Sequence, residues 1–255
     1  MLITVESSIM KIYASIILSA TLASNVVYAG PADYVYMPTV EYGEREIDFK
    51  LGSASYENGL HRTDTSLGVG YGATEYWFTE LYLKREVEGM ASDVTMAEWE
   101  NKFQLLETGK YPVELGLITE IEAPVSQSGP WELKIGPLLQ TEFGKLQLNA
   151  NMLFERKYSS DSSGVQYPTE ALYQWQIKYR LQPEFEFGAQ GFGTLGEWDT
   201  WVGDKVEENR SIGPAVFGKV ALGNRQAIKY NAAWLIGSGT GVAERTFRMQ
   251  AEYEF

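Results

Sequence analysis

The chain has 255 residues, no cysteine and a formal net charge of −13. The lack of cysteine excludes a disulfide framework and a thiolate metal site. The acidic balance argues against a nucleic-acid partner, because binding to phosphate needs a basic surface.

The first 29 residues have the character of a secretory signal peptide. Lys11 supplies a positive charge, residues 12–27 are mostly apolar, and Val27-Tyr28-Ala29 is an acceptable cleavage site. The mature chain is therefore expected to start at Gly30. Residues 1–9 carry an acid but no base, so translation can also begin at Met10. After Ala29 no apolar run approaches the roughly 18 residues that a membrane helix needs.

Residues 30–43 show no regular alternation of apolar and polar residues. We expect them to be either a periplasmic N-terminal segment or a plug in the lumen of the β-barrel that residues 44–255 are predicted to form. In either case we expect Gly30 to Thr39 to lie on the same side as Phe255.

Residues 44–255 contain about twelve segments in which apolar and polar residues alternate with a period of two, which predicts β-strands and excludes a helical bundle. In most segments one parity is apolar, as in Ile47, Phe49 and Leu51, and the other is rich in Glu, Lys, Gln, Asn and Gly. The predicted strands are 44–57, 64–73, 75–87, 95–107, 112–123, 131–143, 145–157, 169–181, 183–193, 210–222, 226–237 and 244–255.

The predicted connections alternate in length. Tight turns near residues 73–74, 108–111, 144, 182–183 and 223–225 alternate with longer polar loops, among them 158–168 and 194–209. This alternation is typical of membrane barrels, whereas a soluble β-sandwich, the alternative, has no reason to sort its loops by side. The chain is therefore predicted to be an all-β transmembrane antiparallel up-and-down β-barrel of about twelve strands, with short periplasmic turns and longer extracellular loops.

Charge and glycine patterns suggest a register for the first hairpins. Pairing 75–87 with 95–107 so that Lys84 faces Glu98 and Glu80 faces Lys102 puts opposite charges together. In the preceding hairpin, we expect Gly70 opposite Phe78 and Gly72 opposite Tyr76. Two explanations fit the inward glycines at 68, 70 and 72: aromatic cover at a point of high curvature, or space for a ligand or for residues 30–43.

Two Gly-Pro pairs interrupt strands that run toward the turns. Pro137 and Pro214 each lack a ladder donor. Because a closed barrel has no edge strand, we expect a local bulge near each of them.

The final segment, Thr246 to Phe255, places Phe247, Met249, Ala251, Tyr253 and Phe255 on one face and charged or polar residues on the other. It resembles the closing strand of Gram-negative outer-membrane β-barrels. That resemblance implies a bacterial outer-membrane location, contact with lipid and lipopolysaccharide, and reading of Tyr253 and Phe255 by the barrel-assembly machinery.

The strand count resembles that of small channels for nucleosides and for acidic oligosaccharides, and of the outer-membrane phospholipase. Acidic-sugar channels carry a basic lumen, so the acidic balance here argues against that substrate. The chain also resembles proteins grouped with aromatic-degradation gene clusters, which implies passage of hydrophobic compounds. The predicted role is passive uptake of small polar or mildly hydrophobic solutes; the alternative is a closed barrel that serves structure or a partner protein.

Interleaved charges are predicted to face the lumen, where they either pair and fill a narrow barrel or line an aqueous path. The predicted pore-lining residues are Glu80, Lys84, Glu98, Glu100, Lys102, Glu120, Lys134, Arg180, Glu186, Lys229 and Arg248.

The enzyme hypothesis depends on His61, the only histidine, which lies in the first outer loop near Ser55, Ser66, Asp64 and Asn58. The phospholipase pattern needs a serine two residues after the histidine, and Thr63 stands there instead. No catalytic residue or cofactor is assigned. The loop at 194–209 carries five acids and two tryptophans, but their spacing matches no calcium loop, so no metal site is assigned.

Overall fold

The computed structural model describes residues 30–89, 93–125, 128–159, 166–199 and 209–255. The expected signal peptide at 1–29 and most of the acidic loop at 194–209, including Trp201, Asp204, Glu207 and Glu208, lie outside these residues.

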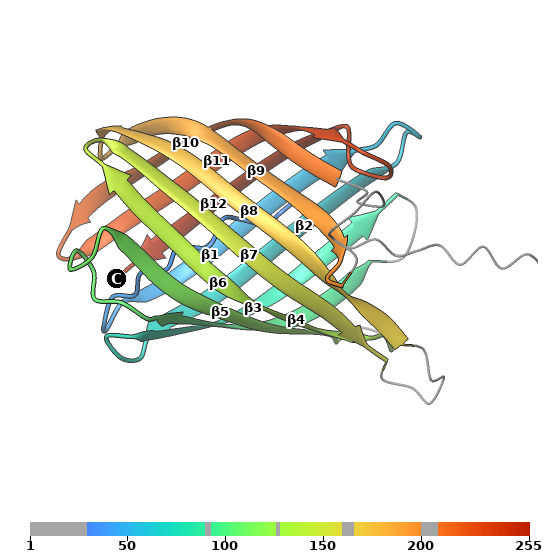
Figure 1. Cartoon of the computed structure of the whole chain (residues 1–255), viewed down its shortest axis with the longest axis horizontal. Coiled ribbons are helices and arrows are strands. Elements are labelled where there is room, and N and C mark those ends of the chain that lie inside the picture. The colour runs from blue at the N-terminus through green and yellow to red at the C-terminus, as the bar shows by residue number, and fades with distance from the viewer. Residues whose placement is uncertain (1–29, 90–92, 126–127, 160–165, 200–208) are drawn as a thin grey trace, which may run out of the picture.

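Twelve strands of the described chain form one closed antiparallel barrel (Figure 1). Each strand pairs with its neighbours in sequence, and β1 pairs with β12 to close the ring. The strands are β1 (Arg45–Ser55), β2 (His61–Gly72), β3 (Trp77–Glu88), β4 (Val94–Gln104), β5 (Val113–Pro124), β6 (Trp131–Phe143), β7 (Leu146–Tyr158), β8 (Gln166–Gln182), β9 (Phe185–Glu197), β10 (Asn209–Gly223), β11 (Gln226–Ser238) and β12 (Arg245–Glu254). The prediction of about twelve strands is confirmed.

Within the described residues, no helix is long and apolar enough to cross a membrane.

The alternation in the sequence becomes two chemically different faces. The apolar parity points outward and stays exposed, as at Leu67 (57%), Leu81 (59%) and Ile236 (59%), while the polar parity points into the lumen and is largely buried. Such an exposed apolar band would be unstable in water and is the lipid-facing surface of a transmembrane barrel.

The two ends of the barrel differ in their connections (Figure 1). At the end that holds Phe255, which we call the turn end, the connections 73–76, 144–145, 183–184 and 224–225 are short. The exception is 105–112, because β4 ends at Gln104, three residues before the predicted end. The opposite end, the loop end, carries the loops between β1 and β2, β3 and β4, β5 and β6, β7 and β8, β9 and β10, and β11 and β12.

The register predicted for β3 and β4 is wrong by two residues. Lys84 faces Met96 and Glu80 faces Glu100. A shift of two leaves every side chain on its predicted face, and Lys84 still reaches Glu98 diagonally, with 2.7 Å between Nζ and Oε2.

The register predicted for β2 and β3 is wrong by the same amount. Gly70 faces Glu80 and Gly72 faces Phe78, because the chain turns through residues 73–76 rather than through a two-residue turn.

Aromatic rings cover two of the inward glycines. A Cβ atom on Gly68 would lie 2.3 Å from the ring of Tyr82, and one on Gly70 would lie 2.5 Å from the ring of Phe78. Cover by aromatic rings therefore accounts for these two positions.

The bulges predicted near Pro137 and Pro214 are not found. The pairing of β6 with β7 skips residues 136–137 and resumes in the same register, and the pairing of β10 with β11 skips 213–214 in the same way. A Cβ on Gly136 or Gly213 would lie within 2 Å of a carbonyl oxygen of the partner strand. Each Gly-Pro pair thus lets the two backbones approach closely and omits ladder bonds without adding a residue.

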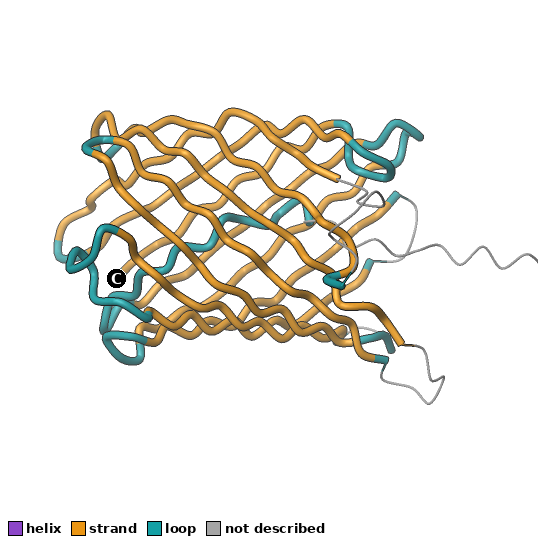
Figure 2. The backbone as a smooth tube through the Cα atoms, in the orientation of Figure 1, coloured by secondary structure: helices purple, strands orange, loops and turns teal. Residues whose placement is uncertain are grey.

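Residues 30–43, hereafter the N-terminal segment, run along the inside of the barrel from the loop end to the turn end (Figure 2). At the turn end, Gly43 donates its backbone N–H to the carbonyl of Gly72 over 2.8 Å. At the loop end, a Cβ on Gly52 would lie 2.1 Å from the carbonyl carbon of Pro31. The expectation that Gly30 lies on the same side as Phe255 is therefore wrong, because the segment crosses the lumen.

Inward glycines make room for this segment. A Cβ on Gly72 would lie 1.9 Å from the carbonyl oxygen of Glu41, and one on Gly116 would lie 2.9 Å from the Cα of Pro38. Because the atoms met are mostly main-chain atoms, a side chain at these positions could not be accommodated by a change of rotamer.

Candidate functional site

Among the described residues, two large cavities lie in the lumen, one toward each end. The larger, about 850 Å³, opens at the turn end, where Glu44, Arg180 and Lys219 lie in its wall. The smaller, about 370 Å³, opens at the loop end, where Gly30, Glu86 and Lys157 lie in its wall.

A layer of buried polar residues separates the two cavities, and we call it the central layer. It consists of Tyr34 and Tyr36 from the N-terminal segment with Asp48, Lys50, Tyr82, Glu100, Glu120 and Lys134 from the strands; all are buried except Tyr34, which is partly buried. Its parts belong to β1, β3, β4, β5 and β6, so the layer spans one half of the wall.

Two tyrosines fix the N-terminal segment to this layer. The hydroxyl of Tyr34 donates to Glu100 over 2.6 Å, and the hydroxyl of Tyr36 donates to Glu120 over 2.7 Å. Glu120 also pairs with Lys134, with 2.9 Å between Oε1 and Nζ. Hydrogen bonds to an ionised acceptor are among the stronger ones in proteins.

A buried ammonium group lies between two aromatic rings in the same layer. The Nζ atom of Lys50 lies 3.7 Å from the ring centre of Tyr34 and 3.6 Å from that of Tyr82. Asp48 lies 3.4 Å from this ammonium and accepts a hydrogen bond from the Tyr82 hydroxyl. The tyrosine of the N-terminal segment thus completes a cation-π arrangement that begins on the barrel wall.

The barrel wall also contacts the N-terminal segment through the segment's backbone and through apolar side chains. The amide of Asn151 on β7 donates to the carbonyl of Tyr36 over 2.9 Å, and the N–H of Val40 donates to Gln104 on β4 over 2.8 Å. Val35 packs in one apolar cluster and Tyr36 in another.

All the predicted pore-lining residues lie on inward-facing positions, in three groups. Lys84, Glu98, Glu120 and Lys134 line the smaller cavity. Glu80, Lys102, Arg180, Glu186 and Lys229 line the larger one. Glu100 and Arg248 are buried and lie in the wall of neither cavity.

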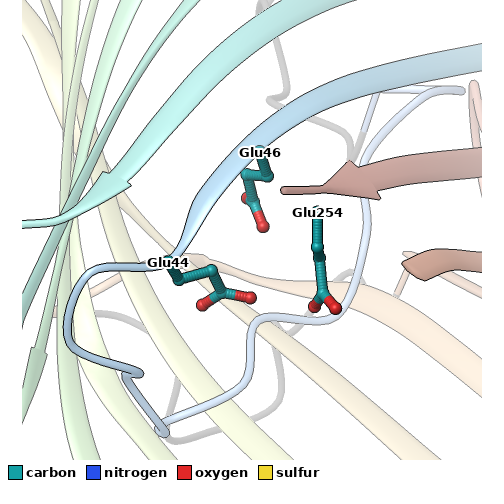
Figure 3. A group of neighbouring side chains, drawn as sticks. All are labelled: Glu44, Glu46 and Glu254. Carbon is teal, nitrogen blue, oxygen red and sulfur yellow. The ribbon is translucent and has the colours of Figure 1, made fainter. Parts of the chain in front are cut away.

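Three carboxylates meet near the turn end, on Glu44, Glu46 and Glu254 (Figure 3). Their oxygens lie within 4.8 Å of one another, a spacing that suits a metal ion. The ammonium group of Lys229, however, pairs with Glu44 over 3.1 Å and also with Glu254. A lysine therefore supplies the positive charge here, and we assign no metal ion.

Neutralising two bases of the larger cavity is expected to make current through the barrel more selective for cations. Lys102 and Lys229 both line this cavity, and their replacement leaves its carboxylates uncompensated. Because charged walls create potentials of several kT, Lys102→Gln/Lys229→Gln should raise the cation-to-anion permeability ratio several-fold in reversal-potential measurements. Lys145→Gln, at an exposed turn, is the control. An unchanged reversal potential would mean that ions do not pass these residues.

Several apolar side chains that face the lumen were not predicted from the sequence. These are Ile118, Leu138, Leu153, Leu172, Phe192, Phe217 and Leu235, all buried. The signal was present, because each stands on the parity that is otherwise polar; Ile118, for example, lies between Gly116 and Glu120.

His61 lies at the loop end on the outward face and is exposed. Its Nδ1 lies 3.1 Å from the Ser55 hydroxyl, so the two side chains are in contact. Asp64 is bonded to Arg62 instead. Among the described residues no third group orients the imidazole, whereas a serine nucleophile needs one.

The closed ring of antiparallel strands, the apolar outer face and the polar lumen together define a class of protein, the transmembrane β-barrel. Solved outer-membrane proteins have this fold. An outer-membrane channel from Pseudomonas putida F1 is 15% identical, with a TM-score of 0.57 over 88% of this chain and 98% of that one. The KdgM porin is 8% identical, with a TM-score of 0.55 over 82% and 99%. The β domain of the Bordetella autotransporter BrkA is 12% identical, with a TM-score of 0.56 over 84% and 99%.

No family model matches the chain, and no curated protein matches it in sequence. The similarity to these structures therefore concerns the fold alone, which is that of a closed outer-membrane β-barrel.

Proposed function

We propose that this protein is an outer-membrane channel for small polar or mildly hydrophobic solutes, and that the N-terminal segment controls its conductance. The observation that carries the proposal is the position of Tyr34 and Tyr36, which lie between two cavities of about 850 and 370 Å³. The barrier between the cavities includes a separate stretch of chain, so movement of that stretch can join them. The channel-forming barrels of similar fold support the same role.

The proposed role also implies which membrane components and which cellular machinery the protein contacts. The outward face contacts lipid and, at the loop end, lipopolysaccharide. Tyr253 and Phe255, whose rings lie 5.6 Å apart at the turn end, serve as the signal for the barrel-assembly machinery, and residues 1–29 direct export. We propose no enzymatic activity, since the Ser55 and His61 pair lacks an orienting group among the described residues.

Loosening the central layer is expected to increase conductance. Tyr34→Phe/Tyr36→Phe keeps both rings but removes two hydrogen bonds to carboxylates, each worth about 1.5–3 kcal/mol. Because 1.4 kcal/mol is a tenfold change, the open fraction should rise about 100-fold or more until it saturates. Single-channel recordings of the full chain in planar bilayers measure this change.

Tyr42→Phe is the matched control, because Tyr42 lies in the same segment but is 66% exposed. If neither the wild type nor the double variant conducts although both are folded, the closed structural or partner-binding barrel is the better proposal.

A further inference from the structure

Arg248 on β12 is a buried base, and two of its three side-chain nitrogens have no hydrogen-bond partner among the described residues. It is 2% exposed, and its Nε and Nη1 atoms donate to no group in the described chain. Lys50 and Lys134, the other buried bases among the described residues, each pair with a carboxylate. Leaving a buried charge unpaired is unfavourable by several kcal/mol, so this arginine calls for a functional explanation.

The positions beside Arg248 on the neighbouring strands carry almost no side chain. Its register partners are Gly52 on β1 and Ala233 on β11. The N-terminal segment fills the space that they leave: Pro31 lies over Gly52, and Val35 packs against Ala233. A groove beside the guanidinium is thus built into the wall and is occupied by a separable stretch of chain.

The other walls of this groove are apolar. Val35 lies in a buried cluster with Phe192, Ala215, Phe217, Ala233 and Leu235. The guanidinium carbon of Arg248 lies 4.7 Å from the ring centre of Phe192. The groove therefore offers an unpaired planar cation at one edge and an apolar surface of two aromatic rings and small aliphatic groups beside it.

We propose that Arg248 binds the carboxylate of a small organic acid with an apolar body, which takes the place of Val35 when the N-terminal segment moves. The guanidinium fork matches a carboxylate in a bidentate manner, and the body packs on Phe192 and Phe217. An inorganic anion would form only the ionic interaction with the guanidinium. A neutral ligand of the same shape would form only the apolar contacts with the two rings. The proposal deepens the proposed function, since it needs a segment that can move.

The ligand and the N-terminal segment compete for one groove, so binding should depend on the position of the segment. A ligand whose competent state is rarely populated shows an apparent affinity reduced by that fraction. We therefore expect Tyr34→Phe/Tyr36→Phe, which loosens the segment, to bind the acid more tightly than the wild type does.

Isothermal titration calorimetry of the full chain in detergent tests the proposal, with benzoate, neutral benzamide and sulfate as probes. We expect benzoate to bind the double tyrosine variant, and benzamide and sulfate to bind at least about tenfold more weakly, since each forms only one of the two interactions. Adding Arg248→Met should weaken benzoate binding at least about tenfold and leave benzamide binding unchanged. Lys145→Gln, at an exposed turn, should change neither.

Equal binding of benzamide and benzoate, or undiminished benzoate binding after Arg248→Met, would overturn the role of Arg248. Binding of sulfate as tight as that of benzoate would overturn the role of the apolar surface. Absence of benzoate binding to the double tyrosine variant would overturn the proposed site as a whole. Phe192→Ala, which leaves the charge in place, should weaken benzoate but not sulfate, and keeps the test open if Arg248→Met fails to fold. Benzoate binding without any ionic current would refute the proposed channel but not this binding site. Ionic current without benzoate binding would refute this binding site but not the proposed channel.

Discussion

A valine at position 52 is expected to drive the N-terminal segment from the lumen and to leave the barrel conducting. A Cβ atom there would lie 2.1 Å from the carbonyl carbon of Pro31 and 2.4 Å from the backbone N of Ala32. Since main-chain atoms cannot move aside by rotation of a side chain, the overlap should disfavour the bound segment by at least the ~3 kcal/mol at the upper end of overpacking costs. The ratio of closed to open barrels should then fall by about 100-fold or more.

Single-channel recording of Gly52→Val measures this change, and protease treatment of the folded protein gives an independent readout, because an expelled segment becomes a substrate. Gly70→Val is the matched control. Its Cβ would meet the ring of Phe78 and the side chain of Glu46, both of which can rotate away. Equal currents from both variants would show that loss of packing, rather than release of the segment, opens the barrel.

A charged substitution on the lipid-facing surface is expected to lower the stability of the barrel strongly. Val216 lies at the middle of β10, points outward and is 38% exposed. An arginine at the bilayer midplane costs about 2–4 kcal/mol, so Val216→Arg should lower the free energy of unfolding in lipid by that amount.

Asn231→Arg is the control for this prediction. Val216 pairs with Ala232 on β11, so Asn231 lies at nearly the same depth but faces the larger cavity. Its replacement should cost far less in a reversible unfolding assay. Equal costs would contradict the assignment of the two faces.

The strands and their faces could be predicted from the sequence because lipid and lumen impose opposite polarity on alternate residues. The segment 131–143 was predicted with the bounds that β6 has in the structure. The least accurate bound is the end of β9, which continues to Glu197, four residues beyond the prediction; glycines at 191, 193 and 196 weaken the alternation there.

Pairing within hairpins could not be predicted as well, because polarity fixes which face a residue takes but not which of two partners it meets. Lys84 illustrates this: it faces Met96 yet bonds to Glu98 and Glu122. Long side chains reach diagonal neighbours, so matching charges in the sequence does not select one register.

The path of the N-terminal segment was the least accessible to prediction. Residues 30–43 form no strand, and their partners Glu100, Glu120 and Asn151 lie far along the chain. Space for residues 30–43 was one of two explanations for the inward glycines, but the sequence contains no signal for the direction in which that segment crosses the lumen.

Residues 30–43 precede β1, and β1 pairs with β12 to close the barrel. The first residues of the described chain therefore lie inside the barrel that the rest of the chain forms. If cleavage follows Ala29 as expected, the new amino terminus is Gly30, whose N atom lies 2.9 Å from Oδ2 of Asp33 at the loop end. The two ends of the processed chain then emerge on opposite sides of the outer membrane, the amino terminus toward the cell exterior and Phe255 toward the periplasm. A short epitope placed before Gly30 would be displayed to antibodies on intact cells.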